Sequence, residues 1–119
     1  MPDANRFPFQ NLDAYRLARG LAARVHAAAI RDAELRDQAT RAAKSAFLNL
    51  CEGLPSDRPA IRLKFFDQAA GSLHEAVAAV DLAEAIGVVA ATHSAEIHAE
   101  ALRLRGILRG LMRASGRGR

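Results

Sequence analysis

The sequence of 119 residues contains no tryptophan, a single cysteine and only four prolines. With Cys51 as the one thiol, no disulfide can form within the chain, and its neighbours Phe47, Leu48 and Leu50 indicate a packed thiol in a reducing compartment. β-Branched residues are also few, whereas alanine, the strongest helix former, is abundant. The composition therefore predicts an all-α protein.

Long hydrophobic runs are missing as well. No apolar stretch reaches the roughly 18 residues that a transmembrane helix needs, and the first residues lack the basic-then-apolar pattern of a secretion signal. We therefore expect a soluble, cytoplasmic protein. The length suits one domain with one core, so residues 1–114 are expected to form a single four-helix-bundle domain and residues 115–119 a flexible basic tail.

The sequence also lacks the patterns that would indicate an enzyme. No glycine-rich phosphate loop follows a strand, and no two histidines are spaced i, i+4 as a helical metal site requires; the histidines are His26, His74, His93 and His98. No catalytic residue, metal site or cofactor is predicted. The alternative from the enzyme class is a small enzyme that uses Glu52 or Glu75.

Four segments have apolar residues every three or four positions, which is typical of amphipathic helices. The first is expected to begin with Asn11 as its N-cap and to run to about Ile30, and the second to span about 34–52. Gly53 should end the second helix in the left-handed C′ conformation, and Pro55 should block its continuation.

The third predicted helix has a marked beginning and end. Ser56 or Asp57 should cap it, with Pro59 in the first turn, and Gly87 should end it as a second C′ glycine. Gly71 lies in its middle, and close approach of a neighbouring helix is the simplest reason for a glycine there.

The fourth helix is expected to begin near Thr92 or Ser94 and to continue to about Ala114. The joints between all four segments are short, and short joints force neighbouring helices to run antiparallel. Packing of this kind gives a left-handed crossing. The sequence therefore predicts an antiparallel, up-and-down, left-handed four-helix bundle.

Polar side chains form one stripe along the second helix and another along the third. Spacings of three and four place each set on one helix face: Gln38, Arg41, Ser45, Asn49 and Glu52 on the second, and Lys64, Gln68, Ser72 and Glu75 on the third. We interpret these polar stripes as a structural network that fixes helix register and assembly, with Arg41–Glu75 and Asn49–Gln68 as example pairs. A plain solvated face and a binding surface for a ligand or partner remain as alternatives.

The positive charge is concentrated at the C-terminal end. Six of the 17 basic residues and none of the 13 acidic residues lie within 103–119, so the rest of the chain carries a formal charge of −2. This region is predicted to contact RNA or DNA through Arg103, Arg105, Arg109, Arg113, Arg117 and Arg119. Aromatic residues are missing there, so we expect salt-sensitive binding to the phosphate backbone; the alternative is a basic helix end that complements its own dipole.

The polar stripes also carry a family resemblance. The pattern Gln38-x-x-Arg41-Ala42-Ala43-x-Ser45-x-x-x-Asn49-Leu50-x-Glu52-Gly53, followed by Phe65-Phe66-x-x-Ala69-x-Gly71-Ser72-Leu73-x-Glu75, resembles the small bundle proteins encoded within intervening sequences of bacterial 23S rRNA genes. The similarity covers about residues 7–87, and the chain departs from the family pattern after Gly53.

This resemblance implies a left-handed up-and-down bundle, a ring-shaped homopentamer and no enzymatic activity. The same fold occurs in the accessory variability proteins of diversity-generating retroelements, which engage a reverse transcriptase and nucleic acid. The sequence therefore leads to a non-enzymatic, self-associating protein that binds RNA or DNA, with an accessory variability protein as the alternative.

Overall fold

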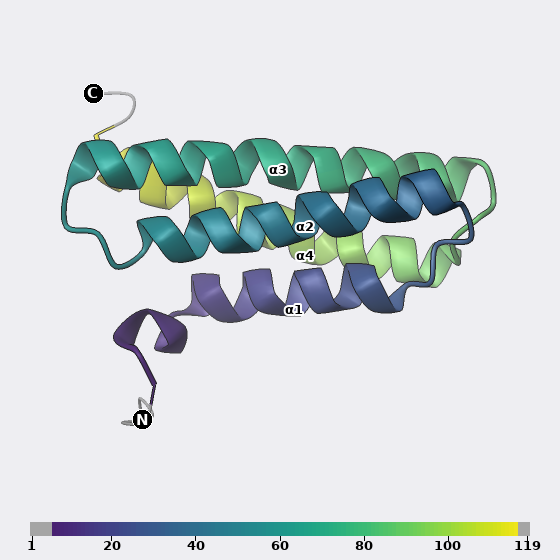
Figure 1. Cartoon of the computed structure of the whole chain (residues 1–119), viewed down its shortest axis with the longest axis horizontal. Helices are drawn as coiled ribbons and strands as arrows, with labels where there is room; N and C mark the ends of the chain where they lie inside the picture. The colour runs from purple at the N-terminus through teal and green to yellow at the C-terminus, as the bar shows by residue number, and fades with distance from the viewer. Residues whose placement is uncertain (1–5, 117–119) are drawn as a thin grey trace.

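A computed structural model describes residues 6–116, and within them it contains four α-helices and no strand. The helices are α1 (Asp13–Ala27), α2 (Ala33–Gly53), α3 (Pro59–Ala85) and α4 (Ala91–Ala114), and a short 3-10 turn, Pro8–Asn11, precedes them. Figure 1 shows the helices side by side, with their joints at alternate ends of the molecule. The predicted all-α class with four helices is confirmed.

The start of α1 differs from the prediction. Asn11 belongs to the 3-10 turn, and Leu12 stands at the N-cap without a side-chain cap bond, so the expected Asn11 cap is wrong. The turn is stabilised because the Gln10 side chain accepts the Phe7 N–H at 2.9 Å. At its other end α1 ends at Ala27, since Ala29 takes a left-handed φ of 54° that turns the chain.

Gly53 has a different role from the expected left-handed cap. It remains inside α2, and Leu54 follows in right-handed conformation. A Cβ at Gly53 would lie 2.7 Å from Cε1 of Phe66, so this glycine is required by close packing of α2 against α3. The end of α2 is instead satisfied by Arg62, whose Nη1 lies 2.9, 2.9 and 3.3 Å from the carbonyl oxygens of Leu54, Ser56 and Gly53.

The beginning of α3 is only partly as predicted. Pro59 occupies the first turn, but Arg58 is the N-cap residue and makes no side-chain cap bond, so neither Ser56 nor Asp57 caps the helix. The Ser56 hydroxyl instead accepts the Arg58 N–H at 3.2 Å. The Arg62 guanidinium bridges this joint, because its Nη1 donates to the carbonyls of both Gly53 and Ser56.

The end of α3 matches the prediction. Gly87 has a φ of +78°, the Val88 N–H donates to the Ala83 carbonyl at 2.9 Å, and the Gly87 N–H donates to that of Glu84 at 3.0 Å. These two bonds form a Schellman motif. The same joint is tied to the joint between α1 and α2, because the backbone N–H of Arg31 donates to the Val88 carbonyl at 2.9 Å.

One further expectation needs correction. No heavy atom lies within 4 Å of a Cβ built on Gly71, so no neighbouring helix approaches it closely. α4 begins at Ala91, next to Thr92, which agrees with the predicted start. The predicted end of α4 at Ala114 is confirmed.

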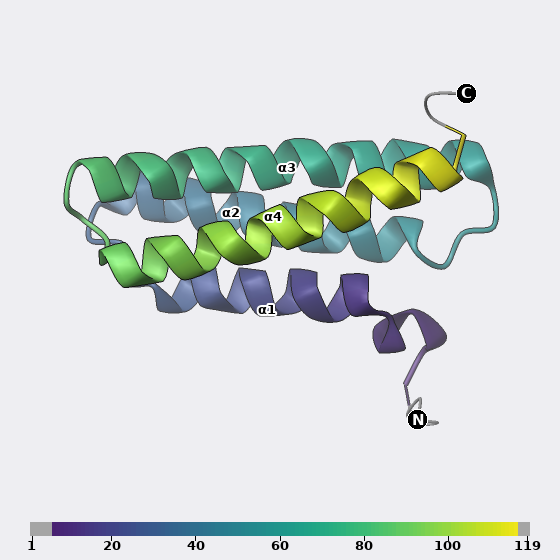
Figure 2. The ribbon, with the colours of Figure 1, turned by 180° about the vertical axis from the view of Figure 1, so that it is seen from behind.

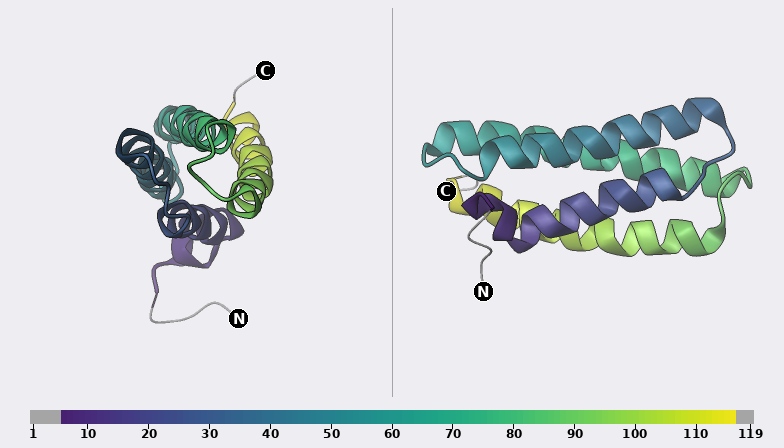
Figure 3. Two further views of the ribbon diagram at one scale, coloured as in Figure 1. Left: turned by 90° about the vertical axis from the view of Figure 1, so that its right-hand side faces the viewer. Right: turned by 60° about the horizontal axis from the view of Figure 1, so that its bottom comes forward.

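The core lies between the four helices, as the end-on view in Figure 3 shows. α2 contributes mainly small side chains, so its backbone can lie close to α3; these are Ala39, Ala42, Ala43 and Ala46. Large side chains fill the remaining space, among them Ile30, Leu50, Phe66, Ile97, Leu104 and Leu108. Figure 2 shows that α4 runs diagonally, beginning beside α1 and ending beside α3.

None of the helices within residues 6–116 combines the length and the hydropathy that crossing a bilayer would require.

Substituting two glycines by alanine is expected to shift stability in opposite directions. Gly53→Ala should destabilise the fold by about 1–3 kcal/mol, because its Cβ would collide with the Phe66 ring. Gly20→Ala should stabilise it by about 0.5–1 kcal/mol, since a Cβ there meets nothing within 4 Å and alanine favours the helix. Urea unfolding measures both values, and a neutral Gly53→Ala would contradict the packing described.

Candidate functional site

The two polar stripes meet at one point in the structure. Ser45 Oγ and Ser72 Oγ lie 2.8 Å apart across α2 and α3, with either hydroxyl able to donate. The Asn49 Nδ2 donates to the carbonyl of Ser45 at 2.9 Å and to its hydroxyl at 3.1 Å. All three side chains are half-buried, so these hydrogen bonds join α2 and α3 in a partly desolvated site.

The other members of the polar stripes lie on the surface. Gln38, Arg41, Glu52, Gln68 and Glu75 are exposed, and neither Arg41–Glu75 nor Asn49–Gln68 forms an ion pair or hydrogen bond in the described part of the chain. The Asn49 amide is engaged by its own helix instead.

Gln38, Arg41 and Glu75 line a shallow groove of about 700 Å³ between α2 and α3. Leu82 also lines this groove and is 51% exposed, and Leu48 on the outer side of α2 is 59% exposed. We call this region the α2–α3 face. It combines exposed leucines with the charges of Arg41 and Glu75, which form no ion pair in the part of the chain that the structure describes.

The arginines of α4 divide into two sets. Arg105, Arg109 and Arg113 line a groove of about 660 Å³ between α3 and α4, whereas Arg103 is exposed elsewhere on the helix. The first three lie on the flank of α4, beside the buried Leu108 and Met112. Arg117 and Arg119 lie outside the described residues.

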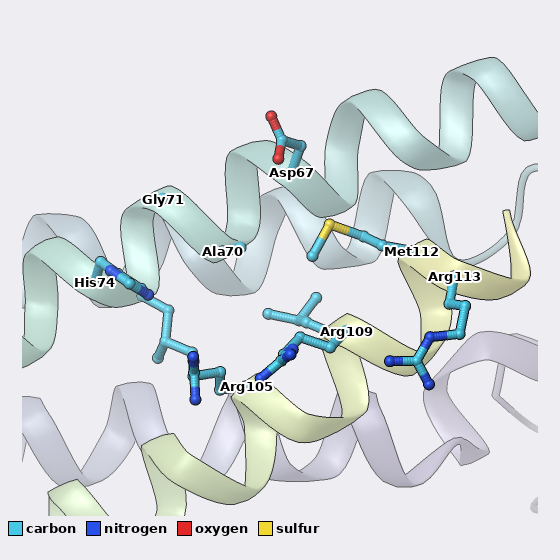
Figure 4. Close-up of a pocket in the computed structure, with 10 residues that line it drawn as sticks. Asp67, Ala70, Gly71, His74, Arg105, Arg109, Met112 and Arg113 are labelled. Carbon is cyan, nitrogen blue, oxygen red and sulfur yellow. The ribbon is translucent and has the colours of Figure 1, made fainter. Parts of the chain in front are cut away.

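We call this groove the basic groove. Figure 4 shows Arg105, Arg109 and Arg113 extending from α4, while Asp67, Ala70, Gly71 and His74 come from α3. No ion pair joins these arginines to an acidic side chain within residues 6–116. The contributions of Asp67 and His74 were missed by sequence reasoning, because no local pattern indicates which residues of α3 lie opposite α4.

The acidic residues of α4 are engaged in its first half. Arg24 of α1 pairs with Glu96 through Nη1 at 2.5 Å and with Glu100 through Nε at 2.8 Å. These ion pairs attach α4 to α1 and leave the second half of α4 purely basic. The acidic residues of α4 therefore face α1, and its basic residues lie in the other half of the helix.

The surroundings of Cys51 do not favour a reactive thiolate. Burial raises the pKa of the Cys51 thiol, and the negative charge of Glu52 raises it further. The thiol therefore remains protonated at neutral pH and is a poor nucleophile. Within residues 6–116, no three side chains of histidine, cysteine, aspartate or glutamate gather closely enough to hold a metal ion.

Glu52 and Glu75, the candidate residues of the alternative enzyme hypothesis, lie on different helices. Glu52 is exposed near the end of α2, and Glu75 is exposed in the middle of α3. Only Glu75 lines the α2–α3 groove.

The hydroxyl pair between the polar stripes should be energetically coupled. Ser45→Ala is expected to cost about 0.5–1.5 kcal/mol, because Ser72 then loses its partner in a half-buried site. In the Ser45→Ala background, Ser72→Ala should lower the free energy of unfolding by less than it does in the parent protein. A double-mutant cycle on the free energy of unfolding measures this coupling, and strictly additive effects would show that the pair does not fix the register.

A family model described as 23S rRNA-intervening sequence protein matches residues 10–110. This range contains all four helices up to the last turn of α4, together with both polar stripes and most of the basic groove. No curated protein matches the chain. Because the match spans most of the sequence and agrees with the four-helix, all-α structure, the chain belongs to the family of 23S rRNA-intervening sequence proteins.

Proposed function

We propose that this protein is a non-enzymatic, self-associating helical bundle that binds RNA or DNA through the basic groove and works in the cytoplasm. The observation that carries the proposal is the row of Arg105, Arg109 and Arg113, which is exposed on one flank of α4 and forms no ion pair with another residue of 6–116. Arginine is suited to this role because its planar guanidinium matches the geometry of a phosphate.

The spacing of the row suits a polyanion. The three arginines follow one another at i, i+4 and i+8, so their Cα atoms rise by about 6 Å per step along the helix. Such a linear array can contact successive phosphates of one strand and release the counterions condensed on them. Arg103 extends the positive surface outside the groove, and Arg117 and Arg119 of the basic tail would extend it further.

For self-association we propose the α2–α3 face. Exposed Leu48 and Leu82 would lose their contact with water in an assembly, and Arg41 and Glu75 would find partners on a second copy. We further propose the antiparallel, up-and-down, left-handed topology and a ring-shaped homo-oligomer, with five copies favoured. In such a ring the α2–α3 face of one copy would pack against a different face of the next copy, because only head-to-tail contacts close around an axis of more than two copies.

The family assignment favours this reading over an accessory variability protein. That alternative predicts a reverse transcriptase as the partner of this protein. A reverse transcriptase gene beside the gene for this protein would support it, whereas a position inside an rRNA insertion would support the intervening-sequence reading.

The double variant Arg109→Gln/Arg113→Gln is expected to bind duplex RNA more weakly and with less salt dependence. Each lost phosphate contact should lower the slope of log K against log salt by about 0.9. Fluorescence anisotropy over a salt series measures this slope. Arg19→Gln, which removes an exposed charge from α1, is the matched control and should change the slope little. An unchanged slope for the double variant would exclude the basic groove as the binding surface.

Charge placed on the α2–α3 face should disrupt the assembly. Leu48→Glu/Leu82→Glu is expected to lower the mass in solution toward that of a monomer, because two carboxylates per copy would have to be buried. Leu102→Glu is the control, since Leu102 is similarly exposed but lies on the α3–α4 side. Light scattering at micromolar concentration gives the mass, and a monomeric parent protein would refute self-association.

A further inference from the structure

An aromatic side chain protrudes from the molecule just before α1. Phe7 is 70% exposed, more than any other large hydrophobic side chain within residues 6–116. Leu12, which connects the 3-10 turn to α1, is 45% exposed. We call Phe7, Leu12 and the outer side of α1 the α1 face. Exposed aromatic and aliphatic side chains that lie together in this way are typical of a protein–protein contact.

The Phe7 ring is held in place although it is exposed. The Phe7 N–H donates to the Gln10 side chain at 2.9 Å, and the Phe7 carbonyl accepts the Gln10 N–H at 2.9 Å. The ring meets that of Phe9 edge-on with centres 6.2 Å apart, and Phe9 meets the buried Tyr15 in the same way at 5.8 Å. Because the exposed ring is anchored to the core, covering it with a partner would cost little conformational entropy.

The α1 face lies at the same level along the bundle as the exposed leucine of α2. The rings of Tyr15 on α1 and Phe47 on α2 are in contact, with centres 5.6 Å apart. Leu12 lies three residues beyond this contact as seen from the joint of α1 and α2, and Leu48 lies one residue beyond it. At about 1.5 Å per residue, the levels of Leu12 and Leu48 therefore differ by only about 3 Å.

The α1 face and the α2–α3 face lie on neighbouring sides of the bundle. α1 packs against α2 and α4, whereas α2 packs against α1 and α3. The end-on view in Figure 3 shows α1 and α3 on either side of α2. Contacts between two surfaces that are inclined to each other turn from copy to copy about an axis, so they can close into a ring.

The two faces have net charges of opposite sign. The outer side of α2 and the adjoining part of α3 expose four acidic and three basic side chains, namely Glu34, Asp37, Glu52 and Glu75, and Arg41, Lys44 and Lys64. The α1 face carries three basic side chains and one acidic side chain, namely Arg6, Arg16 and Arg19, and Asp13. Unlike faces therefore attract and like faces repel each other, which favours head-to-tail contacts over two-fold pairing.

We propose that the α1 face of one copy binds the α2–α3 face of the next copy, in a ring whose axis runs along the bundle, with Phe7 and Leu12 covering Leu48. This inference rests on the proposed self-association and names the second face that the ring requires. Rotation about such an axis keeps every residue at its own level, so the common level of Leu12 and Leu48 brings them together. Side chains that are exposed in a single copy then lose their contact with water in the assembly.

Cross-linking of introduced cysteines tests which faces meet. The variants Leu12→Cys and Leu48→Cys, each in a Cys51→Ala background, are co-expressed and treated with a short reagent that joins two thiols. We expect covalent dimers on a denaturing gel from the co-expressed pair and none from either variant alone, because a head-to-tail contact never brings two equivalent residues together. Leu102→Cys co-expressed with Leu48→Cys is the matched control and should give no dimer, since Leu102 is 53% exposed but lies on the α3–α4 side.

A second variant tests the aromatic anchor. Phe7→Ser should raise the concentration at which the assembly dissociates about tenfold or more, because aromatic side chains at the centre of a contact contribute much of its binding energy. Light scattering over a dilution series measures this concentration, and circular dichroism checks that the helices are retained. Leu102→Ser removes a similarly exposed side chain from the α3–α4 side and should leave the dissociation unchanged.

The outcomes separate this inference from the proposed self-association. An assembled protein in which Leu12→Cys and Leu48→Cys do not cross-link, or in which Phe7→Ser has no effect, refutes the α1 face as the partner surface while self-association stands. Covalent dimers of Leu48→Cys with itself would reveal a two-fold contact and refute the head-to-tail pairing in the same way. A parent protein that is monomeric at micromolar concentration refutes both proposals together.

Discussion

The structure depends on the contact between Gly53 and Phe66 at the joint of α2 and α3. The missing side chain at Gly53 lets the Phe66 ring lie against the α2 backbone, and the Arg62 guanidinium stacks on that ring, with its central carbon 5.0 Å from the ring centre, while it binds three carbonyl oxygens of the joint. One turn of α3 thus fixes both the end of α2 and the distance between the two helices. This fixed distance brings the hydroxyls of Ser45 and Ser72 within reach of each other, so the polar stripes meet in a single register.

α3 separates two surfaces of different character. Toward α2 it contributes Glu75 and Leu82 to the α2–α3 face, and toward α4 it contributes Asp67, Gly71 and His74 to the basic groove. α4 is attached to α1 in its first half through the ion pairs of Arg24, and its second, basic half lines the basic groove with α3. The proposed assembly and the proposed nucleic-acid binding would therefore use different sides of the same helix.

Much of the fold could be predicted because its causes are local. The apolar period of each helix, Pro59 in a first turn and the left-handed Gly87 each depend on residues within a few positions of one another. The errors arose where a distant contact outweighs a local preference. Gly53 has the sequence context of a C′ glycine, yet it stays helical where the Phe66 ring packs against it, and the Arg62 guanidinium binds the carbonyl oxygens at the end of α2.

The sequence alone determined the all-α class, the four helices, the polar stripes and the concentration of arginine on α4, because periodicity and charge can be read along the chain. Only the tertiary structure decided which residues oppose those arginines and which members of the stripes touch. The apolar pattern of a helix indicates the side from which a residue projects. It does not indicate which residues of the neighbouring helix lie opposite that residue. In the structure Gly71 and His74 of α3 lie across from the arginine row, where the groove is formed.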